Sequence, residues 1–419
     1  MKRTALDNDL NATGSNSRRS FLRFAALAAA APMLSEAHFA MAAQQATTPQ
    51  PKRGRASHPQ MKPPADAVLI NANENPMGPC KEAQDAICAM APLGGRYDLL
   101  DEGAKLTKTI AAKLNVSEDH IAVYAGSSEP LQYAVMAFTS PERSVVTADP
   151  SYEAPMWAAA STGTKVRKVA LTADCAHDVK AMVAADANAG LIYICNPNNP
   201  TGTLTAKKDI EWALENKPKG SVLLVDEAYI HLSDAPDVLD MVRADKDLIV
   251  LRTFSKVYGM AGIRCGMALA RPDLLAKLYA YGQNALPVTA VAAATASLMQ
   301  ANLVPQRKKI IEDIRNETLA WLKTNGYKVI GDPVSNCFMI DTGRPGPGVI
   351  QALMEKKVYI GRVWPVWPNA VRVTVGSAED MKAFRAAFDA VMKAPPVENA
   401  ELDRRMLEAI DPMVWRPYA

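Results

Sequence analysis

Short apolar segments bounded by turn residues recur between residues 119 and 270. They are rich in Val, Ile and Leu, which is typical of strands that are buried on both faces of a sheet. Seven segments follow this pattern: DHIAVYAGSS (119–128), RSVVTADP (143–150), KVRKVAL (165–171), GLIYICNP (190–197), SVLLVDEAY (221–229), DLIVLRTFSK (247–256) and GIRCGMALA (262–270).

Helical patterns separate many of these strands. The clearest are EPLQYAVMAFTS (129–140), YEAPMWAAAST (152–162), DVKAMVAAD (178–186) and KKDIEWALENK (207–217). Alternating strands and helices form a mostly parallel sheet with helices on both faces. The pattern therefore predicts an α/β fold whose large domain spans about residues 96–300.

A second, smaller unit follows in the chain. A long amphipathic pattern at 304–326 precedes shorter strand and helix patterns, which predict an α+β domain over residues 301–393. Residues 66–95 are expected to add an N-terminal segment to this small domain. The tail, residues 394–419, opens with two prolines and includes a short helical pattern, and its role is not readable from the sequence.

The first 42 residues have the layout of an export signal. Arg18 and Arg19 precede a Phe-Leu pair and a short Ala/Leu-rich run, and a small-x-small site ends at Ala42. The order Ser-Arg-Arg-x-Phe-Leu resembles the signal recognised by the twin-arginine export machinery, so we expect a periplasmic protein. The alternative is a polar tail with a stray apolar stretch, and the protein then stays in the cytoplasm. Residues 43–65 are polar and proline-rich and predict a linker.

Composition narrows the classes of partner. Of the 419 residues, 49% are hydrophobic and 22% charged, which is ordinary for a globular protein. The net charge of +3, without a basic run interleaved with aromatics, argues against nucleic acid as a partner. The histidines and cysteines lack metal-ligand spacing, so no metal site is expected, and the six cysteines are interpreted as small buried hydrophobes.

The segment LRTFSKVYGMAGIRCG contains the first chemical candidate. Lys256 follows an apolar strand, and Arg264 lies eight residues further on, with glycines between them. A partly desolvated lysine loses its proton near neutral pH and can form a Schiff base, and an arginine can anchor a phosphate. The simpler alternative is a strand that ends in a polar loop.

Three further polar motifs stand at predicted strand ends, where ligands of such sheets gather. AGSSEPLQY places Ser127 and Ser128 before a helix, which suits a phosphate or an ordinary N-cap. CNPNNPTG is a rigid turn that orients Asn199. LLVDEAY ends a strand with Asp226, and Tyr229 follows it. A buried Asp226 stays ionised only if it is paired with a cation. The alternative is an aspartate that caps a helix.

Taken in their order along the chain, the four motifs resemble those of the fold-type I aminotransferases of class I/II that use pyridoxal 5'-phosphate. The similarity is closest to the histidinol-phosphate aminotransferase branch. It extends to LINANENPMGP (69–79), GRYD (95–98), DPSYEAP (149–155), VSNCFMID and VRVTVGS, so it covers residues 69–390. The resemblance implies an aspartate aminotransferase-like fold with a large cofactor-binding domain.

The resemblance also implies roles for the matching residues. Lys256 resembles the lysine that forms the Schiff base and moves the proton, Asp226 the partner of the ring nitrogen, and Tyr152 the aromatic residue stacked on the ring. The other matched cofactor-binding residues are Ser127, Ser128, Asn199, Tyr229, Thr253, Ser255 and Arg264. Tyr97 resembles a tyrosine that reaches the cofactor phosphate of the partner subunit, which implies a homodimer.

For the substrates, the resemblance implies an amino acid and a 2-oxo acid. Arg372 resembles the arginine that binds the α-carboxylate, and Asn75 and Asn336 lie in neighbouring family motifs. The segment YIGRVWPVWPNA departs from the family pattern, with Arg362 where the distal end of the substrate is read. We expect glutamate or an aromatic amino acid as donor if this segment binds substrate. The alternative is a structural loop whose tryptophans pack between the domains.

Two other functions remain open from the sequence. The same cofactor and fold also serve amino-acid decarboxylases, racemases and lyases. An exported binding protein with a silent site would be a different class. It is less consistent with four retained polar motifs, because a silent site has no physical need for a buried charge.

Overall fold

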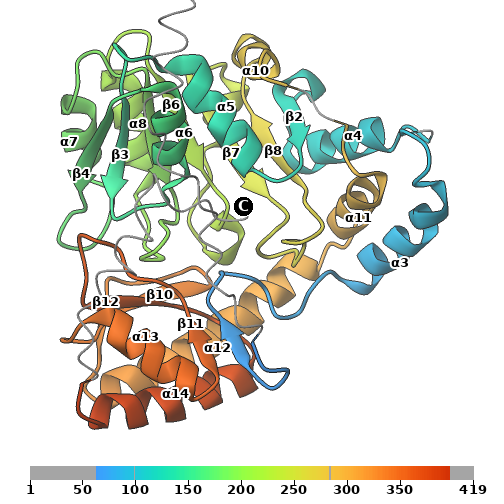
Figure 1. Ribbon diagram of the computed structural model, residues 1–419. Helices are drawn as coiled ribbons and strands as arrows, with labels where there is room; N and C mark the ends of the chain where they lie inside the picture. Colours follow the sequence, from blue (N-terminus) through green and yellow to red (C-terminus); the bar gives the residue numbers. More distant parts are fainter. Residues whose placement is uncertain (1–62, 99, 283–284, 397–419) are drawn as a thin grey trace, which may run out of the picture. The chain divides into compact units, whose positions relative to one another are not determined.

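The computed structural model describes residues 63–98, 100–282 and 285–396. Its largest element is a seven-stranded sheet in the order β2-β8-β7-β6-β5-β3-β4 (Figure 1). The strands are β2 (Ile121–Tyr124), β3 (Val145–Asp149), β4 (Val166–Ala170), β5 (Leu191–Cys195), β6 (Val222–Asp226), β7 (Leu248–Thr253) and β8 (Gly266–Leu269). Each lies inside one of the seven apolar segments, so the predicted α/β fold with a mostly parallel sheet is confirmed. Only the pairings of β8 with β7 and with β2 are antiparallel.

Alternate residues of the central strands pack into two separate cores, because successive side chains of a strand point to opposite faces of the sheet. In β5, Ile192 and Ile194 belong to one cluster of buried residues, whereas Leu191 and Tyr193 belong to the other. This is why these strands are apolar throughout rather than alternating.

Each face of the sheet has its own set of helices. One face packs against α5 (Ser128–Phe138), α6 (Ala154–Thr162) and α10 (Pro272–Tyr279). The opposite core includes residues of α3 (Lys81–Met90), α4 (Glu102–Leu114), α7 (Val179–Ala184), α8 (Lys207–Asn216), α9 (Leu239–Arg243) and α11 (Val288–Leu298). Three single 3-10 turns complete this part: η1 (Ala91–Leu93), η2 (Glu118–His120) and η3 (Ile230–Leu232).

The small part contains two further sheets. One is antiparallel, in the order β12-β10-β9, and the other is a parallel pair of β1 and β11. Its strands are β1 (Val68–Ile70), β9 (Lys328–Ile330), β10 (Cys337–Asp341), β11 (Val358–Ile360) and β12 (Ala370–Thr374), and its helices are α12 (Leu303–Thr324), α13 (Gly346–Glu355) and α14 (Ala378–Lys393). The N-terminal segment divides between the two parts, because β1 pairs with β11 while α3 packs on α11.

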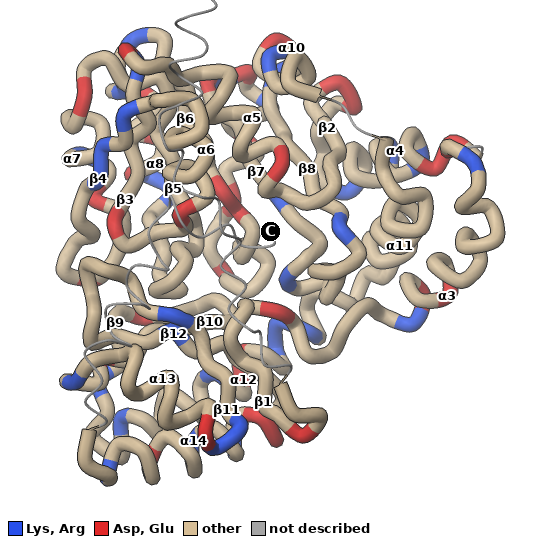
Figure 2. The backbone as a smooth tube through the Cα atoms, in the orientation of Figure 1, with Lys and Arg blue, Asp and Glu red and all other residues tan. Residues whose placement is uncertain are grey.

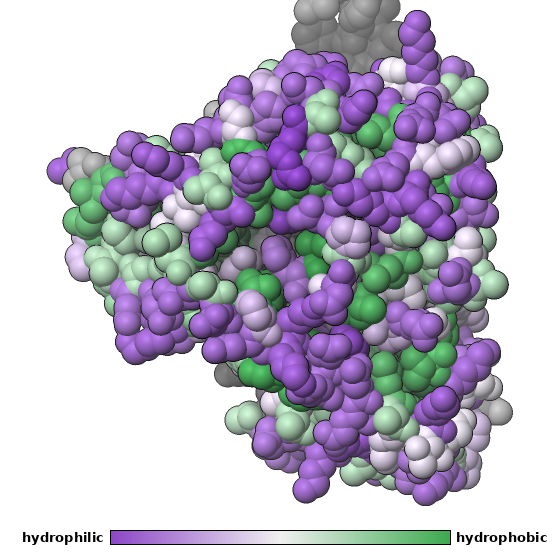
Figure 3. Space-filling view, turned by 180° about the vertical axis from the view of Figure 1, so that it is seen from behind, coloured by the Kyte–Doolittle hydropathy of each residue, from purple (hydrophilic) through white to green (hydrophobic). Residues whose placement is uncertain are grey.

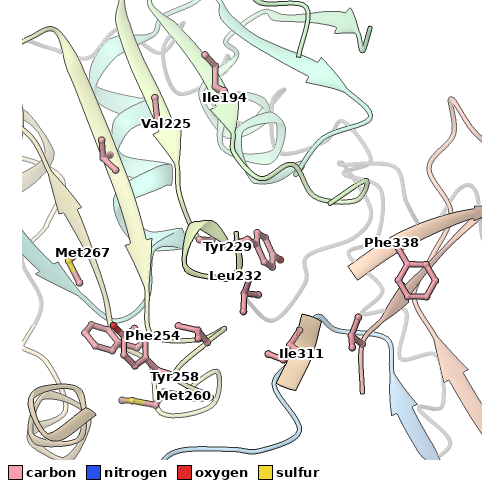
Figure 4. Packing of buried hydrophobic residues seen from close by; sticks show 14 of the residues in the cluster. Ile194, Val225, Tyr229, Leu232, Phe254, Tyr258, Met260, Met267, Ile311 and Phe338 are labelled. Atoms are coloured by element: carbon pink, nitrogen blue, oxygen red, sulfur yellow. The ribbon is translucent and has the colours of Figure 1, made fainter. Parts of the chain in front are cut away.

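One hydrophobic core joins the two parts. Val225 on β6 and Phe254 beyond β7 belong to the same cluster as Ile311 of α12 and Phe338 of β10 (Figure 4). Aromatic contacts tighten it next to the lysine loop, where the rings of Phe254 and Tyr258 lie 4.8 Å apart between centroids. The loop that contains Lys256 is therefore anchored by packing from both parts.

Charged residues of both signs are interspersed along the helices (Figure 2), and the rear face is largely polar with apolar patches between (Figure 3). All six cysteines lie in the described ranges and are unpaired. Five of them are buried, as interpreted, and Cys88 is exposed. No single helix among the described residues is long and apolar enough to cross a bilayer, and α11 and α12 reach that length only together, across an 85° bend.

Candidate active site

The polar motifs meet at the carboxyl ends of β5, β6 and β7. Asp226 is the last residue of β6 and is in register with Cys195 at the end of β5 and with Leu251 of β7. Asn199 follows β5 and Lys256 follows β7 after short connections. The three strands are parallel neighbours and end at the same edge of the sheet, so the residues that follow them lie close together.

Asp226 is a buried carboxylate that accepts two hydrogen bonds. The Tyr193 hydroxyl donates to its Oδ2 at 2.9 Å and the Ala228 N–H to its Oδ1 at 3.1 Å. Burial raises the pKa of Asp226 to about 6, although these donors and the charge of Lys256 oppose the rise. A cationic ligand group beside the carboxylate would stabilise its ionised form.

Lys256 has the setting expected of a reactive amine. Its Nζ donates to the Asn73 carbonyl at 3.1 Å and lies 5.3 Å from the centre of the Tyr229 ring. Burial, followed by the positive charge of Arg372, lowers the pKa of Lys256 to about 8. A useful fraction of the amine is thus neutral near physiological pH.

A cradle for an anion lies beside the lysine. Arg264 adopts φ +71° and donates from Nη1 to the Ala261 carbonyl at 2.8 Å and to Ser255 Oγ at 3.5 Å. Thr253 Oγ1 donates to Ser255 Oγ at 2.9 Å. Gly126 leaves room for the arginine, because a Cβ there would lie 2.2 Å from Arg264 Nη2.

The opposite wall of this cradle is the start of α5. Ser127 precedes the helix and Ser128 is its first residue, so hydroxyl groups and helix N–H groups gather there. Positive charge, hydroxyl groups and a helix N-terminus together fit a phosphate.

Arg372 offers a second anion site. Its Nη1 donates to Asn199 Oδ1 at 2.9 Å and its Nη2 to the Asn71 carbonyl at 2.7 Å. Its Nε is buried and makes no hydrogen bond within the described protein. A buried guanidinium with an unsatisfied N–H is suited to a carboxylate ligand. Because Asn199 Oδ1 accepts from Arg372, the amide N–H group of Asn199 is left to donate elsewhere.

Asn73 connects these groups and was not singled out from the sequence. Its carbonyl accepts from Lys256 and from Asn336 Nδ2 (3.1 Å each), and its own Nδ2 donates to the Tyr229 hydroxyl at 3.0 Å. Its left-handed backbone, with φ 53°, is one that asparagine tolerates better than most residues. The only signal in the sequence was the asparagine-rich run NANEN.

Two predicted substrate residues support the backbone instead. Asn75 uses its Nδ2 to donate to the carbonyls of Lys256 and Val257 at 3.1 and 3.0 Å, so it positions the lysine loop. Asn336 donates to the carbonyls of Asn73 and Glu74, but its Oδ1 is buried and makes no hydrogen bond within the described protein. Asn336 therefore retains an acceptor for a ligand.

Two predicted tyrosines have contrasting environments. Tyr152 lies close to Ser128, and burial raises the pKa of its hydroxyl. Its ring meets Trp157 edge-on at 6.4 Å. Tyr97, in contrast, is 90% exposed in the single chain.

The structure pairs Arg362 with a carboxylate of the protein itself. Its guanidinium forms a bidentate ion pair with Glu153 and stacks on Trp364, with 4.5 Å between Arg362 Cζ and the ring centre. Trp364 is 1% exposed and donates from Nε1 to the Ser151 carbonyl at 3.2 Å. The tryptophan is therefore part of the core, and Arg362 already has a carboxylate partner.

The fold and the site together define a class: an α/β enzyme with a buried amine, a carboxylate and two anion sites at one sheet edge. Residues 65–388 match the model of the family described as Aminotransferase class I and II. The chain belongs to this family.

Curated relatives and a solved structure agree. The chain is 32% identical over 336 residues to the histidinol-phosphate aminotransferase of Symbiobacterium thermophilum, covering 78% of this chain and 91% of the relative. It is 34% identical over 328 residues to the aromatic amino acid aminotransferase of Rhodococcus jostii, covering 76% and 89%. The structure of histidinol-phosphate aminotransferase from Sinorhizobium meliloti in complex with pyridoxal-5'-phosphate superposes with a TM-score of 0.72 at 25% identity, covering 78% and 91%.

These findings confirm the predicted activity and cofactor, so the chain is an aminotransferase that uses pyridoxal 5'-phosphate. The described residues fit that group. Among the described residues Asp226 forms no ion pair and is hydrogen-bonded by Tyr193, the Gly126–Arg264 cradle suits a phosphate, and Lys256 supplies an amine with a lowered pKa.

Proposed function

We propose that this chain is an exported, homodimeric aminotransferase that moves an amino group from an amino acid to a 2-oxo acid, with Lys256 as its catalytic amine. The observation that carries the proposal is the convergence of Lys256, Asp226 and Arg372 at one sheet edge. Each of the three has a buried or strained electrostatic environment that a bound ligand would relieve.

When bound, the cofactor supplies an aldehyde carbon and a ring that withdraws electrons from the substrate Cα. Lys256 Nζ accepts the proton that leaves Cα and donates it again in a later step of the reaction. Its pKa of about 8 suits both tasks, because a general base and acid works best when its pKa is near the working pH.

Asp226 keeps a proton on the ring nitrogen by charge. Burial makes the unpaired carboxylate costly, and a protonated nitrogen beside it removes that cost. Tyr229 and Asn199 would hold the ring oxygen of the bound cofactor as hydrogen-bond donors. The Tyr229 hydroxyl accepts from Asn73, which leaves its own proton for this hydrogen bond.

Ser127, Ser128, Ser255 and Arg264 would hold the phosphate of the cofactor, and Thr253 donates to Ser255. Tyr152 would pack against the ring of the bound cofactor, and Arg372 would bind the α-carboxylate of the substrate through its unsatisfied Nε. Substrate and cofactor are thereby held at separate anion sites, which fixes the reacting carbon near Lys256.

A homodimer is typical of this fold, and the exposure of Tyr97 supports a role across a subunit interface. We propose that Tyr97 reaches the phosphate of the partner subunit's cofactor. Light scattering would test the oligomeric state, and a monomer that retains full activity would contradict this role.

Export rests on the predicted twin-arginine signal at residues 1–42, which lies outside the described residues. The twin-arginine route moves folded proteins, so an enzyme that takes up its cofactor before export fits this route. The double variant Arg18→Lys, Arg19→Lys should accumulate in the cytoplasm. Normal export of this variant would instead indicate the general secretory route.

The substrates named for the relatives, histidinol phosphate and aromatic amino acids, both carry a planar ring. An exported enzyme does not fit cytoplasmic histidine synthesis, so we propose an amino-acid donor and a biosynthetic step of another kind. Mass spectrometry of products from a panel of amino acids, each with 2-oxoglutarate or 4-hydroxyphenylpyruvate as acceptor, tests this. Formation of a new amino acid from the acceptor supports the proposal. Release of CO₂ would indicate a decarboxylase instead, and racemisation of the donor would indicate a racemase.

A further inference from the structure

A buried ion pair lies at the substrate end of the active site. Arg362 Nη1 donates to Glu153 Oε1 at 2.7 Å, and its Nη2 donates to Oε2. The side chains are 17% and 7% exposed. This bidentate arrangement uses both carboxylate oxygens and one edge of the guanidinium.

Two contacts place the pair beside the α-carboxylate arginine. Arg362 and Arg372 both lie against the ring of Trp364, with their Cζ atoms 4.5 and 5.5 Å from its centre. Glu153 also directly follows Tyr152, whose phenol is close to Ser128 at the phosphate cradle. Trp364 therefore links the pair to Arg372, and the chain links it to Tyr152.

The charges at this end sum to one net positive charge. Arg372 and Arg362 contribute two positive charges, and Glu153 contributes one negative charge. A ligand with one carboxylate on Arg372 balances the remaining charge. A ligand with a second, distal carboxylate places an extra negative charge next to Glu153.

We propose that the Glu153–Arg362 pair selects donors and acceptors with a single carboxylate and an uncharged, planar distal group. This inference rests on the proposed function, because it takes Arg372 as the α-carboxylate site. Glu153 is the specificity-determining residue, since it occupies the guanidinium that would otherwise bind a distal carboxylate.

The physical reason is the cost of breaking a buried pair. A distal carboxylate either displaces Glu153, which leaves a carboxylate buried without its partner, or lies beside it as a like charge. A neutral ring avoids both costs and can stack against the paired guanidinium and the adjacent indole. Of the two donor classes expected from the sequence, the pairing favours the aromatic one over glutamate.

Calorimetric titration of the cofactor-loaded protein measures this choice without turnover. The probes are glutarate, with two carboxylates, and 3-phenylpropionate, with one carboxylate and a ring. Wild-type protein should bind 3-phenylpropionate at least about tenfold more tightly. Equal affinities in the wild type would overturn the inference whatever the variants do.

Two variants should move the ratio in opposite directions. Glu153→Gln removes the negative charge that pairs with Arg362, so glutarate affinity relative to 3-phenylpropionate should rise roughly 10-fold to 100-fold. Arg362→Gln removes the cation and leaves Glu153 alone, so the relative affinity for glutarate should fall further. Glu317→Gln breaks the Arg385–Glu317 pair, whose arginine is also 17% exposed, far from the site residues, and is the matched control.

A purely structural pair gives a different result. Glu153→Gln and Arg362→Gln would then weaken both probes alike, or leave the ratio at its wild-type value, and the inference would be wrong. The proposed function is tested separately, by turnover: absence of any new amino acid with every donor would remove the function even if the binding ratios shift as expected.

Discussion

The cofactor end and the substrate end of the active site are built by different kinds of contact. At the cofactor end, Asp226 and Lys256 sit at or just beyond the ends of adjacent strands, so the sheet itself positions them. At the substrate end, Arg362 pairs with Glu153 across 209 positions of the chain, and Arg372 reaches Asn199 across 173. The reaction is thus fixed by the sheet, whereas substrate choice depends on a few contacts with the small part.

This difference predicts that substitutions at the two ends have different effects on activity. Changes at the cofactor end should affect all donors equally, because every donor uses the same chemistry. Changes at the substrate end should alter the ratio between donors. A cofactor-end variant that changes donor preference would break the comparison.

Lys256→Ala should have the largest effect. Loss of the amine removes both the attachment point and the proton carrier, so turnover should fall by about 10⁴-fold or more with every donor. The wild-type protein should be yellow, and the variant should lose its colour on dialysis against a free amine. A colourless wild type that pyridoxal 5'-phosphate cannot reconstitute would contradict the assigned role.

Asp226→Asn should come next, at about 10²- to 10³-fold in kcat, because an amide does not hold a proton on the ring nitrogen by charge. The variant should still bind some cofactor, since the phosphate cradle and Lys256 are intact. Spectrophotometric titration separates binding from turnover. Near-normal kcat would show that Asp226 does not face the ring nitrogen.

The same substitution should stabilise the cofactor-free protein. The folded pKa of Asp226 is raised to about 6, so the folded state binds its proton more tightly than the unfolded state. Stability is therefore lost as pH rises from about 4 to about 6 and stays lower above that range. Asp226→Asn should gain about 2 kcal/mol in the free energy of unfolding at pH 8, and much less at pH 4. Urea unfolding at both pH values measures this gain, and an equal gain at both would refute the sign.

Gly126→Ala should weaken cofactor binding by roughly tenfold, because the added methyl group displaces the guanidinium of Arg264. Gly163→Ala is the matched control. Gly163 also has a positive φ, +69°, but a Cβ there meets nothing within 4 Å. Similar losses of cofactor affinity in both variants would attribute the effect to backbone strain rather than to the cradle.

Tyr97→Phe should have the smallest effect. One lost hydrogen bond to the partner's cofactor phosphate corresponds to about 1 kcal/mol of cofactor affinity. Equilibrium dialysis over a range of protein concentrations measures the loss. The cross-subunit role fails if wild type and variant retain the cofactor equally in the dimer.

Much of the fold followed from short-range patterns. The seven apolar segments predicted all seven strands of the large sheet, because strands buried on both faces are apolar throughout. Helices α3, α4, α9, α10 and α11 were not singled out. In α11, the small apolar residues of VTAVAAATASL carry little amphipathic signal, since most of its surface is buried.

At the site, the position of a residue could be predicted where its motif adjoins a strand, while its role stays a prediction. Asp226 ends β6, Lys256 follows β7 and Arg264 precedes β8. Asn73, Tyr193 and Glu153 were missed because their roles depend on partners more than thirty residues away, as the hydrogen bond from Tyr193 to Asp226 illustrates. Arg362 shows the same limit: its charge was visible in the sequence, but the carboxylate that pairs with it was not.

The central claim is that Lys256 and Asp226 drive amino transfer between single-carboxylate substrates. The most direct test follows the nitrogen: purified protein receives ¹⁵N-phenylalanine and 4-hydroxyphenylpyruvate, and mass spectrometry records the products. The account predicts ¹⁵N-tyrosine and phenylpyruvate in equal amounts, with neither product formed by Lys256→Ala. Appearance of phenethylamine, D-phenylalanine or free ¹⁵N-ammonia in place of ¹⁵N-tyrosine would contradict it.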